Sequence, residues 1–187
     1  MQTLVKPLTH KEFREMEFPG EGERAYIFEL IAGKIVTKAH PTATHQTVLF
    51  ELTLLIGSHV KINKLGKVFF ALFGVVLEPN TDVQPDLFVV LDANLPKLQE
   101  DGFFGAPDLV IEIISPSSIK LDRNTKFKLY ERTGVAEYWI VDTKHQSIEV
   151  YGRQGSGYDL VSFAVEKGAV ESSVLTGLSV EVAEVFG

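Results

Sequence analysis

Two acidic residues near the middle of the chain lie in two apolar, β-prone segments. Asp86 begins the strand predicted in the segment 84–91, just after Pro85, and Glu112 lies late in the segment 106–114, among isoleucines and valines. A carboxylate inside an apolar strand is costly unless it is paired, hydrogen-bonded or bound to a metal. If the two segments pair as antiparallel strands, the start of one faces the end of the other, and Asp86 approaches Glu112. Two close carboxylates repel each other, and a divalent cation relieves that repulsion.

A lysine follows this acidic pair on a predicted helix. Asp122, Lys126 and Tyr130 are spaced four residues apart, which places them roughly on one helix face. A metal ion, two acids and a lysine form a set that cleaves phosphodiesters. The metal activates water, and the lysine positions that water or stabilises the charged oxygen. We therefore expect a site in which Asp86, Glu112 and Lys126 carry the chemistry, with Asp122 and Tyr130 as accessory residues.

Each of these residues also has a structural interpretation. Glu112 could be a buried acid that pairs with Lys126 only for stability, and Asp86 could be a turn residue, since Pro-Asp is a common turn dipeptide. Lys126 could belong to a solvated helix face. Asp122 could be an acid favoured in the first turn of a helix, and Tyr130 a packing residue with a satisfied hydroxyl.

The elements that must position these residues alternate between helices and strands. In chain order, we expect a helix at 10–17, strands at 26–31 and 34–38, a helix at 43–63, strands at 67–77, 84–91 and 106–114, a helix at 121–133, a strand at 135–142, and short strands at 146–151, 158–163 and 169–172. Thr42 or Thr44 would cap the long helix at 43–63, and Gly134 would close the helix at 121–133. This order predicts one domain, residues 1–187, of the α/β class, with a mixed sheet flanked by helices and a C-terminal β-meander.

The composition excludes several classes of protein. The chain has 187 residues and no cysteine, which excludes a disulfide scaffold, a cysteine zinc site and thiol catalysis. The longest apolar run, Phe69–Leu77, is far shorter than the roughly 20 residues of a membrane helix. The first residues show neither the basic start nor the apolar stretch of a signal peptide, so we expect a soluble cytoplasmic protein without a membrane segment.

The charge is acidic but unevenly distributed. A net charge of −7 argues against broad, non-specific binding of nucleic acid. Residues 79–143 carry 11 Asp/Glu against 6 Lys/Arg, and part of that excess is what a divalent-metal site requires. Residues 118–132 carry five Lys/Arg against two acids, a local charge of +3 beside the expected site. We therefore expect weak, salt-sensitive affinity for DNA.

Several stretches together resemble a known family. They are Gln84-Pro85-Asp86-Leu87, the run Pro107 to Ser118, Asp122-x3-Lys126-x3-Tyr130, the run Gly134 to Asp142, the run Phe28 to Val36, His45 at the start of the long helix, Val150-Tyr151, Gly157-Tyr158 and Leu175-x-Gly177-Leu178. With these features the chain resembles the Uma-two family, restriction-endonuclease-like domains that are abundant in cyanobacteria. That family belongs to the PD-(D/E)xK nuclease superfamily, and the resemblance covers nearly the whole chain.

The resemblance implies a fold, a cofactor and a substrate. It implies a restriction-endonuclease-like α/β/α sandwich around a mixed sheet, with Asp86 and Glu112 as ligands of Mg²⁺ or Mn²⁺. Glu29 and His45, which lie in matched motifs, become accessory ligands. By analogy, the substrate is DNA and the protein is a homodimer. The superfamily pattern places a lysine two residues after the acid, where this chain has Ile114, and the resemblance suggests that Lys126 takes over that role.

Three hypotheses about function follow. The first is a metal-dependent endonuclease that hydrolyses DNA phosphodiester bonds, favoured by Asp86, Glu112 and Lys126 together. The second is a non-catalytic nucleic-acid-binding or protein-interaction module that retains the nuclease fold, favoured by Ile114 and the acidic charge. The third is a structural or dimerisation domain. A separation above about 7 Å between the carboxylates of Asp86 and Glu112 would exclude one bridging Mg²⁺, whose ligand distances are about 2.1 Å.

Overall fold

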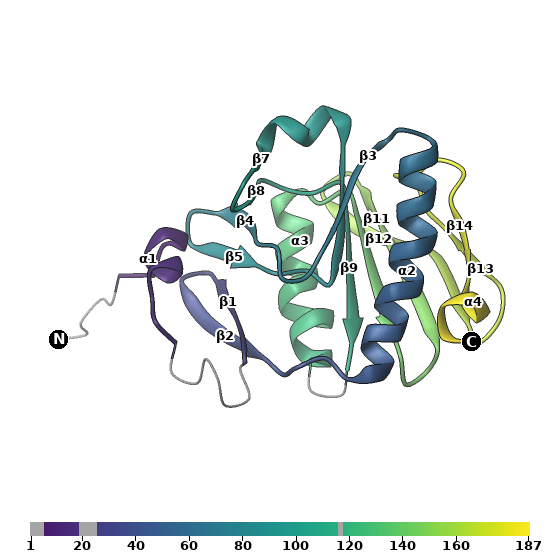
Figure 1. The fold of residues 1–187 in the computed structure, drawn as a ribbon, viewed down its shortest axis with the longest axis horizontal. Coiled ribbons are helices and arrows are strands. Elements are labelled where there is room, and N and C mark those ends of the chain that lie inside the picture. Colours follow the sequence, from purple (N-terminus) through teal and green to yellow (C-terminus); the bar gives the residue numbers. More distant parts are fainter. Residues whose placement is uncertain (1–5, 19–25, 116–117) are drawn as a thin grey trace.

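The structure is a computed structural model that describes residues 6–18, 26–115 and 118–187. Figure 1 shows the helices interspersed among runs of strands. The helices are α1 (His10–Arg14), α2 (Ala43–Ile62), α3 (Phe127–Thr133) and α4 (Val182–Phe186), with a 3₁₀ helix at Asp92–Lys97 and a π-helical turn at Leu121–Lys126. The strands are β1 (Ile27–Ile31), β2 (Lys34–Lys38), β3 (Gly66–Phe70), β4 (Val75–Glu78), β5 (Thr81–Val83), β6 (Leu87–Leu91), β7 (Leu98–Gln99), β8 (Gly102–Phe104), β9 (Leu109–Ile114), β10 (Glu137–Asp142), β11 (Ser147–Gln154), β12 (Gly157–Val165), β13 (Ala169–Glu171) and β14 (Ser179–Glu181). Pro116 and Ser117 of the matched motif lie outside the described residues.

The strands form two six-stranded sheets and a small two-stranded one. The first sheet has the order β2-β1-β5-β4-β8-β7, and the second has the order β12-β11-β10-β9-β6-β3. The second sheet is mixed, because β9 and β10 run parallel while its other neighbours are antiparallel. The expected α/β class with a mixed sheet and flanking helices is confirmed, but the strands divide between two large sheets.

The prediction of a single strand at 67–77 is wrong. Residues 66–70 form β3 in the second sheet, and residues 75–78 form β4 in the first. The two strands are separated near Gly74, where an added Cβ would lie 2.9 Å from the Arg14 guanidinium and 3.0 Å from the Asp82 carboxylate. Because the whole run is apolar, its periodicity carries no sign of the point where the chain changes sheet.

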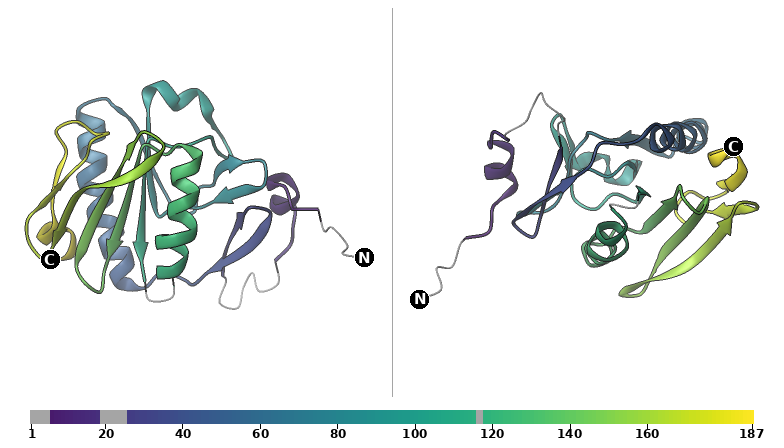
Figure 2. Two further views of the ribbon diagram at one scale, coloured as in Figure 1. Left: turned by 180° about the vertical axis from the view of Figure 1, so that it is seen from behind. Right: turned by 90° about the horizontal axis from the view of Figure 1, so that it is seen from below.

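The second sheet is packed on both faces. α2 covers one face, in a core cluster with Leu109, Ile111 and Ile113 of β9. α3 and part of the first sheet cover the other face, in a cluster that includes Val110 and Ile114. Figure 2 shows the two helices on opposite sides of this sheet. Glu112 alternates with Val110 and Ile114, so its side chain lies on the α3 face.

The C-terminal part agrees with the expected meander in its first two strands. β10, β11 and β12 are successive antiparallel neighbours, whereas β13 pairs with β14 instead of extending that sheet. Residues Val182–Phe186 form the short helix α4. Among the described residues, no helix is both long and apolar enough to cross a membrane.

Candidate active site

The two acid-bearing strands pair in the predicted way. β6 and β9 are antiparallel, with Leu87 opposite Ile111 and Phe88 opposite Val110. That register brings Asp86, just before β6, next to Glu112, and the Ile113 N–H donates a 2.8 Å hydrogen bond to Asp86 Oδ2. Pro85 ends the ladder here because it has no N–H to donate.

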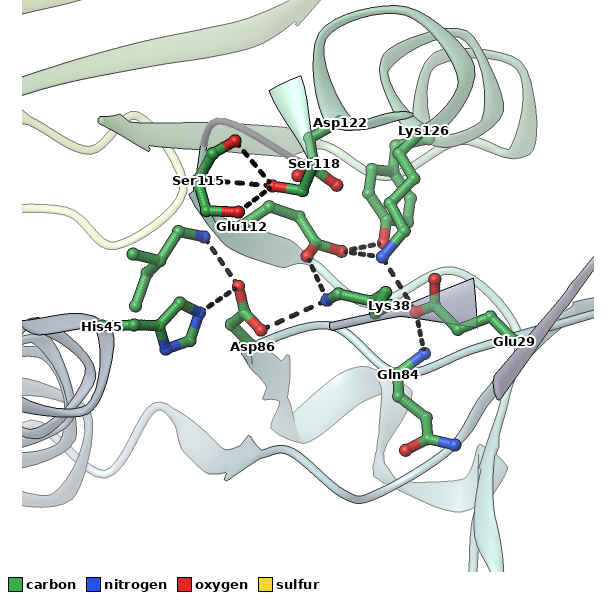
Figure 3. A network of polar contacts seen from close by, with 12 residues as sticks. Glu29, Lys38, His45, Gln84, Asp86, Glu112, Ser115, Ser118, Asp122 and Lys126 are labelled. Atoms are coloured by element: carbon green, nitrogen blue, oxygen red, sulfur yellow. Dashed lines mark hydrogen bonds and ion pairs between the residues drawn. The ribbon is translucent and has the colours of Figure 1, made fainter. Parts of the chain in front are cut away.

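All seven residues expected at the site lie in one cluster; Figure 3 labels six of them together with Lys38, and the seventh, Tyr130, donates a hydrogen bond to Glu112. They come from six elements of the fold. The members are Glu29 on β1, His45 on α2, Asp86 before β6, Glu112 on β9, Asp122 and Lys126 on the π-helical turn, and Tyr130 on α3. We call these seven residues and Lys38 the acid–lysine cluster.

Glu112 is the centre of the cluster and is fully buried. Its Oε1 accepts hydrogen bonds of 2.7 Å from both Lys126 Nζ and the Tyr130 hydroxyl, and its Oε2 lies 3.2 Å from Lys38 Nζ. Burial raises the pKa of Glu112 to about 7, and the charges of Lys126 and Lys38 oppose that rise. Glu112 therefore changes its protonation near neutral pH.

Lys126 is fully buried, so its assignment to a solvated helix face is wrong. Its ammonium lies 2.9 Å from Glu29 Oε1 and 2.7 Å from Glu112 Oε1. Burial alone would lower the pKa of Lys126, but the two carboxylates raise it above its usual value. The Glu29 oxygen also accepts from the Gln84 N–H at 2.8 Å, which ties β1 to the segment before Asp86.

Asp86 is buried and held by three donors, so it is more than an exposed turn residue. In addition to the Ile113 N–H, its carboxylate lies 3.2 Å from His45 Nε2 and 3.3 Å from Lys38 Nζ. Burial alone would raise the pKa of Asp86, but Lys38 and His45 lower it well below its usual value. Asp86 is therefore ionised at neutral pH, unlike its neighbour Glu112.

His45 reaches Asp86 because of the way α2 begins. Thr42 caps the helix, and its hydroxyl accepts from the His45 N–H at 3.2 Å, which confirms the predicted cap. The first turn of α2 thus projects the imidazole toward Asp86. The other ring nitrogen of His45, Nδ1, is buried without a hydrogen-bond partner in the described part of the chain.

Lys38 is the site residue that the sequence analysis missed. Its Nζ lies between the two acids, 3.3 Å from Asp86 Oδ1 and 3.2 Å from Glu112 Oε2. The two oxygens therefore lie no farther apart than the sum of these distances, so the two carboxylates are not separated by more than about 7 Å. The available signal was the hairpin register: Lys38 pairs with Ile27, which shares a face of β1 with Glu29.

The cluster holds more carboxyl groups than ammonium groups. Four buried carboxylates, those of Glu29, Asp86, Glu112 and Asp122, face the ammonium groups of Lys38 and Lys126. Glu29 Oε2 and Asp122 Oδ1 are buried acceptor atoms without partners among the described residues. Burial also raises the pKa of Asp122, against the attraction of Lys126. Oxygen-rich, under-neutralised sites of this kind suit Mg²⁺ or Mn²⁺.

The geometry is not that of a preformed metal cage. No group of three or more His, Asp or Glu side chains converges on one ion position in residues 6–18, 26–115 and 118–187. Instead, the Lys38 ammonium lies where a cation shared by Asp86 and Glu112 would have to bind. The donor set therefore fits a divalent ion held by two carboxylates and water, provided that Lys38 moves away.

A cavity of about 580 Å³ opens beside the cluster. Its polar wall contains Lys38, His45 and Asp86, whereas Glu112 and Lys126 lie behind that wall and do not line it. The cluster therefore has an outer layer that faces the cavity and an inner layer that holds the outer one in place. Lys38, rather than Lys126, is the lysine that reaches the cavity.

The basic segment 118–132 contributes less surface charge than its composition implies. Lys126 is buried in the cluster, and Arg123 forms two hydrogen bonds with the Glu149 carboxylate, of 2.9 and 2.7 Å. Arg132 pairs with Glu78 at 2.6 Å. Three of the five basic residues are thus already occupied by protein acceptors.

A mixed sheet between two helices, with a buried carboxylate pair beside two of its strands, is the arrangement that a restriction-endonuclease-like protein would have. Residues 10–183 match the model of Uma2, described as "Putative restriction endonuclease". The chain belongs to this family.

Individual proteins are also similar to the chain. An uncharacterized protein of Synechocystis is 26% identical over 131 residues, which cover 68% of this chain and 72% of the relative. A crystal structure described as a putative nuclease belonging to DUF820, from Anabaena variabilis, is 24% identical and has a TM-score of 0.74. That likeness covers 96% of this chain and 98% of the other, and it shows a shared fold.

Proposed function

We propose that the protein is a metal-dependent endonuclease that hydrolyses phosphodiester bonds of DNA. The observation that carries this proposal is the buried pair of Asp86 and Glu112. The pair lies beside an open cavity, and the Lys38 ammonium lies between the two carboxylates. Membership in the Uma2 family supports the same activity.

Asp86 and Glu112 would hold one Mg²⁺ or Mn²⁺ ion, since an oxygen of each already lies within 3.3 Å of the Lys38 ammonium. When bound, such an ion supplies a nucleophilic hydroxide at neutral pH and offsets the charge that develops on the phosphate. Asp86 is already ionised, and the Ile113 N–H and His45 fix its orientation. Glu29 and Asp122 add negative charge behind the pair.

The inner layer of the cluster positions Glu112. Lys126 and Tyr130 both donate to Glu112 Oε1, which leaves Oε2 directed toward Lys38 and Asp86. We assign Lys126 the role of the superfamily lysine that Ile114 does not supply, acting by stabilising the ionised acid. Lys38 lines the cavity and, when it leaves the carboxylates, its ammonium can face a phosphate of the substrate.

Residues of both large sheets build this one cluster, which supports a single domain over residues 1–187. Glu29 and Lys38 come from the first sheet, and Glu112 comes from the second. A homodimer and a cytoplasmic location stay predictions that the family resemblance and the sequence supply.

A second candidate is a non-catalytic binding module with the same fold. The position of Lys38 favours it, because an ammonium that never leaves the carboxylates would permanently replace the metal ion. Such a protein would keep the ion-paired cluster for stability and would not turn over DNA.

A cleavage assay separates the two candidates. Supercoiled plasmid and a labelled single-stranded oligonucleotide are incubated with Mg²⁺ or Mn²⁺ and the wild type, Asp86→Asn, Glu112→Gln or Lys126→Met. Asp108→Asn is the matched control, since Asp108 also follows a proline before a strand but accepts its hydrogen bonds from the Leu91 N–H and the Asn94 side chain, outside the acid–lysine cluster. Metal-dependent cleavage that the three cluster variants lose, and the control keeps, supports the nuclease. No cleavage, or cleavage that survives all three substitutions, contradicts it.

A further inference from the structure

We infer that the cavity beside Asp86 binds one unpaired nucleobase, so that the substrate class is single-stranded or locally unpaired DNA. This inference rests on the proposed function, because it specifies the substrate of the same site. It concerns the apolar part of the cavity, which the chemistry of the acid–lysine cluster does not use.

The cavity has the size and lining of a small-molecule site. Its volume of about 580 Å³ lies within the 300–1,000 Å³ that is typical of ligand pockets. Apolar surface predominates in the lining, to which Ile27, Leu49, Phe70, Leu72 and Ile113 contribute. A flat aromatic base suits such a surface, whereas a phosphate does not.

Two of these apolar side chains are unusually exposed. Phe70 keeps 54% of its surface accessible and Leu72 keeps 69%, although both line the cavity. Exposed aromatic rings beside a nucleic-acid site serve as stacking platforms for bases, and such stacking tolerates any sequence. Phe70 therefore provides a surface on which a base can stack at the edge of the cavity.

The position of the cavity connects this base site to the chemistry. Asp86 and Lys38 belong to the cavity wall, so a nucleotide whose base fills the apolar part carries its phosphate next to the acid–lysine cluster. A base in a duplex cannot enter such a cavity unless it leaves the helical stack, which costs unpairing energy. Single strands, mismatches and ends avoid that cost.

The arginines argue against a site built to grip duplex backbone. In the described ranges, each arginine already contacts a protein acceptor: Arg14 binds Asp82 and Asp101, Arg123 binds Glu149, Arg132 binds Glu78, and Arg153 donates to the Glu131 carbonyl. The net charge of −7 further weakens attraction to phosphates. Recognition through a base offers affinity that the electrostatics of this surface do not supply.

The test measures binding without cleavage. Glu112→Gln protein is titrated, by fluorescence anisotropy in Mg²⁺, against a labelled 12-nucleotide single strand and against the duplex of the same sequence. Phe70→Ala is added in the same background, with Phe70→Tyr to restore a ring. Phe163→Ala is the matched control, because Phe163 is 52% exposed on the edge strand β12 and does not line the cavity.

We expect the single strand to bind at least about tenfold more tightly than the duplex, and Phe70→Ala to weaken single-strand binding about tenfold. Phe70→Tyr and Phe163→Ala should bind as the parent protein does. Equal binding of duplex and single strand, or unchanged binding by Phe70→Ala, overturns the inference. This binding result is separate from the cleavage result. Plasmid cleavage together with preferred binding of duplex would support the proposed nuclease activity and overturn the base-binding inference. Preferred binding of single strands without any cleavage would support the base-binding inference and contradict the nuclease activity.

Discussion

Lys38 Nζ lies 3.2 Å from Glu112 Oε2, in the position that a cation shared by Glu112 and its neighbouring acid would take. The pKa of Lys38 is raised well above its usual value, because Glu112 and Asp86 outweigh the effect of burial, so the side chain is charged at neutral pH. Its side chain is 12% exposed and lines the cavity, which gives the ammonium a direction in which to move. A bound metal ion and Lys38 in this position exclude each other.

Replacing Lys38 should therefore strengthen metal binding. In Lys38→Met, a divalent ion no longer competes with a fixed positive charge, and we expect Mn²⁺ to bind at least about tenfold more tightly than to the wild type. Calorimetric titration measures the affinity. Lys34→Met, an exposed position on the same strand, should behave as the wild type does. Unchanged or weaker binding by Lys38→Met would show that Lys38 does not compete with the ion.

Removing the side-chain charge of the buried Lys126 should destabilise the folded protein. Lys126→Met leaves Glu29 and Glu112 without their shared counter-ion, and breaking a buried pair of this kind costs about 3–5 kcal/mol of unfolding free energy. Urea denaturation measures the loss. Lys128→Met, an exposed lysine two residues further along the chain, should change the unfolding free energy by less than about 0.5 kcal/mol. A similar small change in Lys126→Met would contradict the assignment of Lys126 as the buried counter-ion.

The raised pKa of Glu112 has a defined effect on stability. Glu112 titrates near 7 in the folded protein and near 4.5 in the unfolded chain, so the folded state holds the proton more tightly between these values. The stabilisation from this group is complete below pH 4.5 and is lost as the pH rises toward 7. Glu112→Gln removes this titration.

Urea unfolding at pH 5 and at pH 8 tests this relationship. We expect the unfolding free energy of the wild type to fall more between these two values than that of Glu112→Gln. The same pH dependence in both proteins would mean that Glu112 is not the group that titrates near neutral pH.

Tyr130 should contribute more to stability than its partner in packing, Tyr138. Both rings are fully buried, and their centroids lie 5.0 Å apart. The Tyr130 hydroxyl donates to the Glu112 carboxylate, whereas the Tyr138 hydroxyl donates to the backbone carbonyl of Asp122. A hydrogen bond to a charged group is worth about 1.5–3 kcal/mol, and a neutral one about 1 kcal/mol. Tyr130→Phe should thus lower the unfolding free energy more than Tyr138→Phe at pH 8. Equal effects would indicate that Tyr130 acts by packing alone.

The part of the site that local pattern controls could be predicted from the sequence. Side-chain alternation in β9 placed Glu112 on one face, and antiparallel pairing brought Asp86 to it, as the register confirms. Capping by Thr42 and closure by Gly134, with φ of 90°, also follow from local residue preferences. The π-helical turn at Leu121–Lys126 departs from the regular helix expected there, yet it keeps Asp122 and Lys126 on the buried side.

The features of the site and the fold that depend on contacts between distant segments could not be predicted from the sequence. Lys38 lies 74 residues before Glu112 in the chain, and only the packing of the first sheet against the second brings them together. The division of 67–77 between two sheets has the same cause, since an apolar run fits either sheet equally well. The short hairpin of β7 and β8 was likewise hidden in a polar segment that has no alternating pattern.

The most direct test of the central claim is calorimetric titration with Mn²⁺ of the wild type, Asp86→Asn and Asp108→Asn. The claim is that Asp86 and Glu112 together form a divalent-cation site. We expect one ion per chain in the wild type and in Asp108→Asn, and binding at least about tenfold weaker in Asp86→Asn, which loses one of the two carboxylate ligands. No Mn²⁺ binding by the wild type and by Lys38→Met, or undiminished binding by a folded Asp86→Asn protein, would contradict the claim.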